Sequence, residues 1–145
     1  MKYAYRHESP TEHYLADAFA VRCFDNRFRG CFFAFMNEQC QNAFDFESVA
    51  GGAKVLTSPE YESDREFMLR ELEKSIVLHK TRRVMLFTHY DCGAYGGIAR
   101  FNGNETKQFA FHQDELRVAK EVIRKKFPDL TVETYFIDVQ GVVMV

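Results

Sequence analysis

The chain alternates between two hydrophobic patterns, and the first is typical of β-strands. Residues 15–21 and 83–90 are short, nearly continuous apolar runs, as expected for strands buried on both faces. Residues 43–49 alternate phenylalanine with acidic residues, which is the period of two of a strand with one buried face. Residues 131–141 have the composition of a last strand. The pattern therefore predicts four strands.

The second pattern has helical spacing. Before one such segment, Thr57 or Ser58 can act as N-cap and Pro59 suits the first turn, so we expect a helix from about residue 58. Met68, Leu72 and Ile76 form an apolar face of this helix. Leu116, Ala119 and Ile123 form an apolar face of a second predicted helix over 114–127. Residues 29–40 have the length of a short helix, although their phenylalanines also suit a strand.

Alternating strands and helices predict an α/β fold with a central, mostly parallel β-sheet flanked by helices. The segment Ala50-Gly51-Gly52 ends the second strand in a turn that can take positive φ. With 145 residues, no internal repeat and no linker, residues 1–145 are expected to form a single domain.

Composition narrows the class of protein. The chain is 46% apolar and 28% charged, which is ordinary globular composition. The formal net charge of −2 gives no field that would attract nucleic acid or an anionic membrane, so neither is expected as a partner. No apolar run has the length of a signal peptide or a membrane span, so we expect a cytoplasmic protein. In that compartment the four cysteines are expected to be thiols or metal ligands.

Unusual residues follow two of the predicted strands. Cys23, Asp25 and Arg27 stand at alternate positions after the first strand, and His89 and Cys92 stand at the end of the third. Because sites in open α/β sheets gather beyond the carboxyl ends of the strands, neighbouring strands would bring these residues into one cluster.

This cluster has the donors of a zinc site. Two thiolates and an imidazole suit zinc, and three protein ligands leave the fourth position open for a reactive water. Asp25 can accept the hydrogen bond of that water, and Arg27 can fix the carboxylate by bidentate pairing. Glycines 93, 96 and 97 do not match a phosphate-binding or dinucleotide motif and are expected to form turns.

The two motifs, C-x-D-x-R at 23–27 and H-x-x-C-G at 89–93, with the Ala-Gly turn between them, resemble those of the β-class carbonic anhydrases. The resemblance implies that Cys23, His89 and Cys92 are zinc ligands and that Asp25 and Arg27 form the catalytic dyad. It implies a lyase: reversible hydration of carbon dioxide to bicarbonate by zinc-bound hydroxide. In some members the equivalent aspartate closes the open zinc position, which gives Asp25 a second expected role as a gate.

Several residues remain outside these motifs. His79 and His112 are the later histidines that could shuttle protons, and both are expected to be surface or packing residues. Cys31 and Cys40 are expected to be core or interface thiols. The 15 phenylalanines and seven tyrosines, together with the resemblance, favour a homodimer or a larger homo-oligomer.

Two alternative functions stay open. One is hydrolysis of a related heteroallene, carbonyl sulfide or carbon disulfide, which the space around Tyr90 and Tyr95 would decide. The other is a non-catalytic zinc-binding protein on the same fold, which an occluded fourth zinc position would indicate.

Overall fold

A five-stranded sheet forms the centre of the protein, in a computed structural model that describes residues 1–145. The strand order is β2-β1-β3-β4-β5, with every pair parallel except β4 and β5. This confirms the predicted α/β class. The strands are β1 (Ala16–Arg22), β2 (Ala43–Ser48), β3 (Arg83–His89), β4 (Thr131–Ile137) and β5 (Val142–Met144). The helices are α1 (Arg29–Gln39), α2 (Lys54–Thr57), α3 (Glu62–His79) and α4 (Glu105–Lys126).

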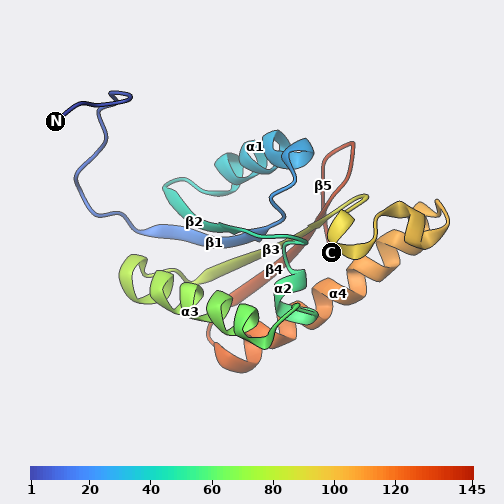
Figure 1. The fold of residues 1–145 in the computed structure, drawn as a ribbon. Helices are drawn as coiled ribbons and strands as arrows, with labels where there is room; N and C mark the ends of the chain where they lie inside the picture. The colour runs from blue at the N-terminus through green and yellow to red at the C-terminus, as the bar shows by residue number, and fades with distance from the viewer.

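The helices cover both faces of the sheet. Figure 1 shows α1 on one face and α2, α3 and α4 on the other, while the N-terminal segment extends away from the body. None of the helices has both the length and the apolar composition needed to cross a lipid bilayer.

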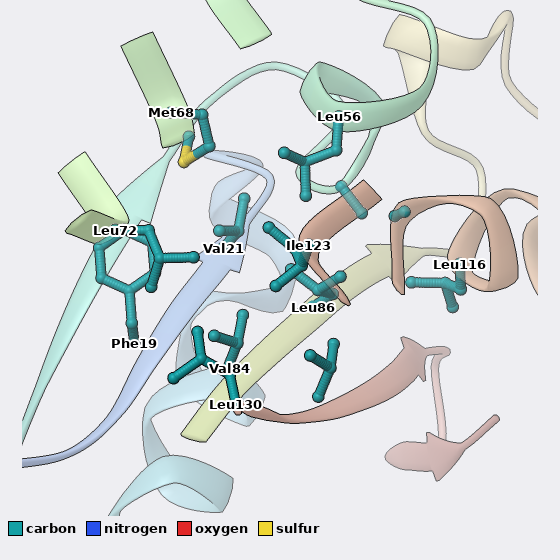
Figure 2. Packing of buried hydrophobic residues seen from close by; sticks show 13 residues of the cluster. Phe19, Val21, Leu56, Met68, Leu72, Val84, Leu86, Leu116, Ile123 and Leu130 are labelled. Carbon is teal, nitrogen blue, oxygen red and sulfur yellow. The ribbon is translucent and has the colours of Figure 1, made fainter. Parts of the chain in front are cut away.

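Strand alternation divides the core into two layers, because successive side chains point to opposite faces. Phe19 and Val21 of β1 pack with Val84 and Leu86 of β3 beneath α2, α3 and α4. Figure 2 shows these side chains converging with those of Met68, Leu72, Leu116 and Ile123 from the helices. The other layer joins Ala18 and Ala20 of β1, Met85 and Phe87 of β3, and Phe32 and Met36 of α1. Both predicted apolar helix faces are therefore part of the core.

The structure corrects three predicted element boundaries. Thr57 and Ser58 do not cap a long helix: Thr57 ends α2, and α3 starts only at Glu62. Its N-terminus is capped by Asp64, whose Oδ2 accepts the Tyr61 N–H at 3.2 Å.

The other two corrections concern α4 and the C-terminal strands. Helix α4 begins nine residues earlier than the predicted start at residue 114, because Asn104 caps it by accepting the Lys107 N–H at 2.9 Å. The strand after it is not the last one, since β5 pairs with it in antiparallel orientation. Residues 29–40, for which helix and strand were both open, form helix α1 from Arg29 to Gln39.

β1 has one irregularity. Ala16 pairs with Ala43 and Phe19 with Asp45, so the register between β1 and β2 shifts between these two pairs. From Phe19 onward the pairing is regular, up to Arg22 with β2 and up to Val21 with β3.

Candidate metal centre

The two strands that carry the predicted site residues are neighbours. β1 and β3 pair in parallel from Phe19↔Val84 to Val21↔Leu86, so their carboxyl ends meet at one edge of the sheet. Cys23 follows β1 directly, His89 is the last residue of β3, and Cys92 lies in the turn beyond it. The topology therefore brings together the two motifs that the sequence separates.

Three donor atoms converge at this edge. The ligand atoms of Cys23, His89 and Cys92 all lie within 4.8 Å of one another. The three residues are 7%, 3% and 2% exposed, so their donors face each other inside the protein. Such a set could hold a metal ion.

The His89 ring is oriented by its own backbone neighbourhood. Its Nδ1 lies 2.8 Å from the Tyr90 carbonyl oxygen, which accepts a hydrogen bond when Nδ1 carries the proton. The ring also packs against Phe28, with 4.7 Å between the centroids. His89 Nε2 then carries a lone pair and is buried with no hydrogen-bond partner. A metal ion at this position would satisfy the orphaned nitrogen, so the donors present fit zinc.

The two thiols of the cluster differ in pKa: that of Cys23 is lowered and that of Cys92 is raised. The hydrogen bond from Cys92 is the largest effect on the pKa of Cys23 and lowers it, although burial acts in the opposite direction. The backbone N–H groups of Asp25 and Gly51 also lower the pKa of Cys23. The pairing with Cys23, together with burial, raises the pKa of Cys92. At least one thiolate is therefore favoured at this edge before any metal binds.

The Ala50-Gly51-Gly52 turn presses against the site, and both glycines have positive φ as predicted. The Gly51 N–H donates to Cys23 Sγ at 3.4 Å. A Cβ at Gly52 would lie 2.3 Å from the Phe87 carbonyl oxygen and 2.8 Å from the Cys23 nitrogen. Only glycine fits at position 52, where the turn backbone meets the ends of β1 and β3.

Asp25 and Arg27 form the predicted pair. Arg27 Nη2 lies 2.7 Å from Asp25 Oδ2, and Arg27 Nε lies 3.2 Å from Asp25 Oδ1. The same carboxylate accepts the Arg27 backbone N–H at 2.9 Å. The hydrogen bonds from the Arg27 side chain lower the pKa of Asp25 to about 2, so it is a carboxylate at neutral pH. Its Oδ2 lies 4.0 Å from His89 Nε2, which places the acceptor beside the donor cluster.

Asp91 joins this pair and was not singled out from the sequence. Arg27 Nη1 lies 3.0 Å from Asp91 Oδ2, and Arg27 Nη2 also donates to the Asp91 carbonyl oxygen at 3.0 Å. The one available signal was an acidic residue inside the H-x-x-C motif itself.

The two later histidines, His112 and His79, lie elsewhere: His112 is shielded from solvent, and His79 lies away from the metal site. His112 is fully buried on α4, with its ring 4.9 Å from that of Tyr95 and 5.1 Å from that of Phe136. His79 ends α3, and its Nδ1 lies 2.8 Å from Asp45 Oδ2. His79 precedes the first residue of β3 and His89 is its last, so the two lie at opposite ends of that strand.

Two cysteines lie outside the donor cluster, and two tyrosines lie near it. Cys31 and Cys40 are free thiols in or against the core layer under α1. Tyr90 donates through its hydroxyl to Glu105 Oε1 at 3.3 Å. Tyr95 is buried in a cluster with Cys23 and Cys92, so its ring limits the space beside the two sulfurs.

A cavity of about 600 Å³ borders the same loops. Its lining includes Ala50, which precedes the Gly51-Gly52 turn, and Ala94, two residues after Cys92. More than half of its lining residues are hydrophobic. The lining also includes the charged residues Lys54, Glu60 and Asp64, so the cavity beside the donor edge is partly apolar and partly charged.

Fold and donor set together define an α/β domain of the β-carbonic anhydrase type with a candidate metal centre. A family model described as "Putative carbonic anhydrase" matches residues 13–145, so the chain belongs to this family.

Relatives by sequence come from Rickettsia. An uncharacterized protein of Rickettsia conorii is 30% identical over 106 residues, which are 71% of this chain and 56% of that protein. An uncharacterized protein of Rickettsia bellii is 27% identical over 105 residues, 71% of this chain and 64% of that protein. The chain thus matches less than two thirds of the length of these relatives.

Solved structures share the fold. Carbonic anhydrase from Streptococcus mutans aligns with a TM-score of 0.64 and 17% identity, over 96% of this chain and 88% of that one. A β-carbonic anhydrase from Trichomonas vaginalis aligns with a TM-score of 0.61 and 13% identity, over 96% and 87%. A tetrameric β-carbonic anhydrase from Sordaria macrospora gives 0.53 and 16%, over 91% and 81%. At these identities the similarity shows the fold alone.

Proposed function

We propose that residues 1–145 form one zinc-binding domain that catalyses the reversible hydration of carbon dioxide to bicarbonate. The observation that carries the proposal is the buried cluster of Cys23, His89 and Cys92, whose donors lie within 4.8 Å and whose His89 Nε2 has no other partner. Family membership supports the reaction class.

Three residues of the chain would bind the metal, and a fourth orients one of them. Cys23, His89 and Cys92 would hold the ion, and three protein donors leave room for water. When bound, zinc supplies the Lewis acidity that makes water a nucleophile near neutral pH. The Tyr90 carbonyl fixes the His89 ring through Nδ1, which would leave Nε2 available to bind the ion.

Asp25 and Arg27 would orient the reacting oxygen. Because the carboxylate stays ionised, it can accept a hydrogen bond from that oxygen and cannot donate one. Arg27 holds both carboxylate oxygens and so fixes the direction of the acceptor. The hydrophobic part of the cavity lining, which includes Ala50 and Ala94, would offer carbon dioxide an apolar surface along which to approach.

The proposal also covers location and assembly. All four cysteines are free thiols, which favours the reducing cytoplasm. A homodimer or larger homo-oligomer is proposed from the aromatic-rich composition and the family.

The test is stopped-flow carbon dioxide hydration by zinc-loaded protein, with zinc quantified on the same sample. The pH range is about 6.5 to 9, which covers the region near neutral pH where zinc makes water a nucleophile. We expect turnover that disappears in Cys23→Ser and falls strongly in Asp25→Ala. Cys31→Ser is the matched control, because it removes a free thiol outside the donor cluster. One zinc per chain without turnover at any pH would refute carbon dioxide as the substrate and favour a larger heteroallene or a non-catalytic role.

A further inference from the structure

The Arg27 guanidinium has two acidic partners, and they come from different loops. On one side it is bidentate to Asp25, two residues away in the same loop. On the other it contacts Asp91, at 3.0 Å to Oδ2 and 3.0 Å to the carbonyl oxygen, across 64 residues of sequence. Arg27 therefore bridges the loop after β1 to the loop after β3.

Asp91 is held in place more firmly than a surface ion pair requires. Its φ of 51° is left-handed, and its Oδ1 accepts the Ile98 N–H at 2.9 Å. A Cβ at Gly97 would lie 2.9 Å from that oxygen, so the carboxylate occupies the space that a side chain at position 97 would need. From α4, the buried Gln108 accepts the Asp91 N–H through Oε1 at 3.4 Å. Backbone, side chain and helix all fix where Asp91 presents its second oxygen.

The consequence reaches Asp25. The Arg27 side chain is 53% exposed, and Asp91 accepts the only hydrogen bonds that Arg27 donates outside its own loop. Without the contacts to Asp91, the Arg27 side chain can turn toward water and release the Asp25 carboxylate. The released carboxylate starts 4.0 Å from His89 Nε2, close enough to compete for the position that the donors leave open.

We propose that Asp91 is a positioning residue that anchors Arg27 and thereby keeps the Asp25 carboxylate directed beside the metal position without occupying it. This inference rests on the proposed metal site. Gln108 supports the same arrangement from α4.

The experiment uses cobalt-loaded protein and measures azide binding by visible absorption, because azide needs the open metal position. Asp91→Asn keeps a carbonyl oxygen for the Ile98 N–H, and asparagine tolerates left-handed φ. We expect azide affinity to fall about tenfold, the lower end for loss of a group that orients a metal site. The cobalt content is expected to stay at one ion per chain.

A double-mutant cycle decides the route of the effect. If Asp91 acts through Asp25, then Asp91→Asn changes azide affinity less than about twofold in an Asp25→Asn background, a difference within normal additivity. Asp114→Asn is the matched control, because it removes an exposed carboxylate of α4 that faces Arg117 at 3.8 Å. Wild-type azide affinity in Asp91→Asn, or an equal loss in both backgrounds, would overturn the inference.

A second variant covers failure of Asp91→Asn to fold. Gln108→Leu removes the acceptor of the Asp91 N–H and leaves every charge in place, with an expected loss of roughly threefold for one hydrogen bond. Unchanged azide affinity in Gln108→Leu would then refute the proposed anchoring. Azide binding needs no turnover, so the absence of carbon dioxide hydration in the wild type would refute the proposed function and leave this test valid.

Discussion

The fully buried His112 makes a prediction about acid stability. Its two ring nitrogens have no hydrogen-bond partner, and aromatic rings of Tyr95 and Phe136 surround it. Burial, with smaller effects of His89 and Arg100, lowers the pKa of His112 from 6.5 to about 4. The folded protein therefore holds a neutral imidazole that the unfolded chain protonates readily.

The sign and size follow from that difference. Above about pH 7.5 both states are neutral and His112 contributes no pH dependence. As the pH falls through 6.5, the unfolded chain gains a proton that the folded protein takes up only near pH 4, so stability decreases. By about pH 5 this decrease amounts to about 2 kcal/mol, and it approaches about 3 kcal/mol below both values.

The change that removes this dependence is His112→Leu. We expect the difference in unfolding free energy, variant minus wild type, to rise by about 2 kcal/mol between about pH 7.5 and pH 5. Any packing change is present at both pH values and cancels, as does the titration of the thiols and carboxylates that both proteins share.

Urea unfolding followed by circular dichroism measures this difference. His13→Leu, a change in the exposed N-terminal segment, serves as control and is expected to match the wild type at both pH values. A constant difference between His112→Leu and wild type over the whole range would refute the argument, since it would mean that the folded protein protonates His112 as easily as the unfolded chain does.

Two further changes test the turn and the donor cluster. Gly52→Ala places a Cβ 2.3 Å from the Phe87 carbonyl oxygen at a φ of 58°, so it is expected to cost at least about 2 kcal/mol of stability in thermal unfolding. Gly30→Ala in α1, where nothing lies within 4 Å, is expected to range from neutral to about 1 kcal/mol stabilising, and equal effects of both changes would contradict the geometry. Chelation of the metal-loaded protein is expected to lower Tm by about 5 °C or more, since a ligand at 100 times its Kd contributes about 2.7 kcal/mol. Cys92→Ser should abolish this response, and a full response in that variant would exclude Cys92 as a ligand.

The sequence predicted the features that depend on local pattern and on strand topology. Buried apolar runs identified β1 and β3, and a parallel sheet requires their carboxyl ends to share an edge, which brings Cys23 to His89. Asp25 and Arg27 pair because they are two residues apart in one loop. The roles of these residues in metal binding and catalysis stay predictions.

What could not be predicted depends on contacts between distant segments. Thr57 and Ser58 are plausible caps by residue type, yet the Gly51-Gly52 turn packs against β3 and leads into the short helix α2, which Thr57 ends. Asp91 pairs with Arg27 across 64 residues, and no local pattern indicates that contact. β5 is only three residues long, too short for a periodicity to be recognised.

The register shift between β1 and β2 sets where the chain tolerates a change of length. Side chains alternate along a strand, so one residue inserted between Phe19 and Cys23 would send every later side chain of β1 to the opposite face. Cys23 would then turn away from His89 and Cys92, even though its sequence neighbours were unchanged. An insertion before Ala16 meets no such constraint, because the irregularity between Ala16 and Phe19 already separates the entry of β1 from its regular pairing. Length variation among homologues is therefore expected on the N-terminal side of that point, while the five residues from Phe19 to Cys23 keep a fixed length.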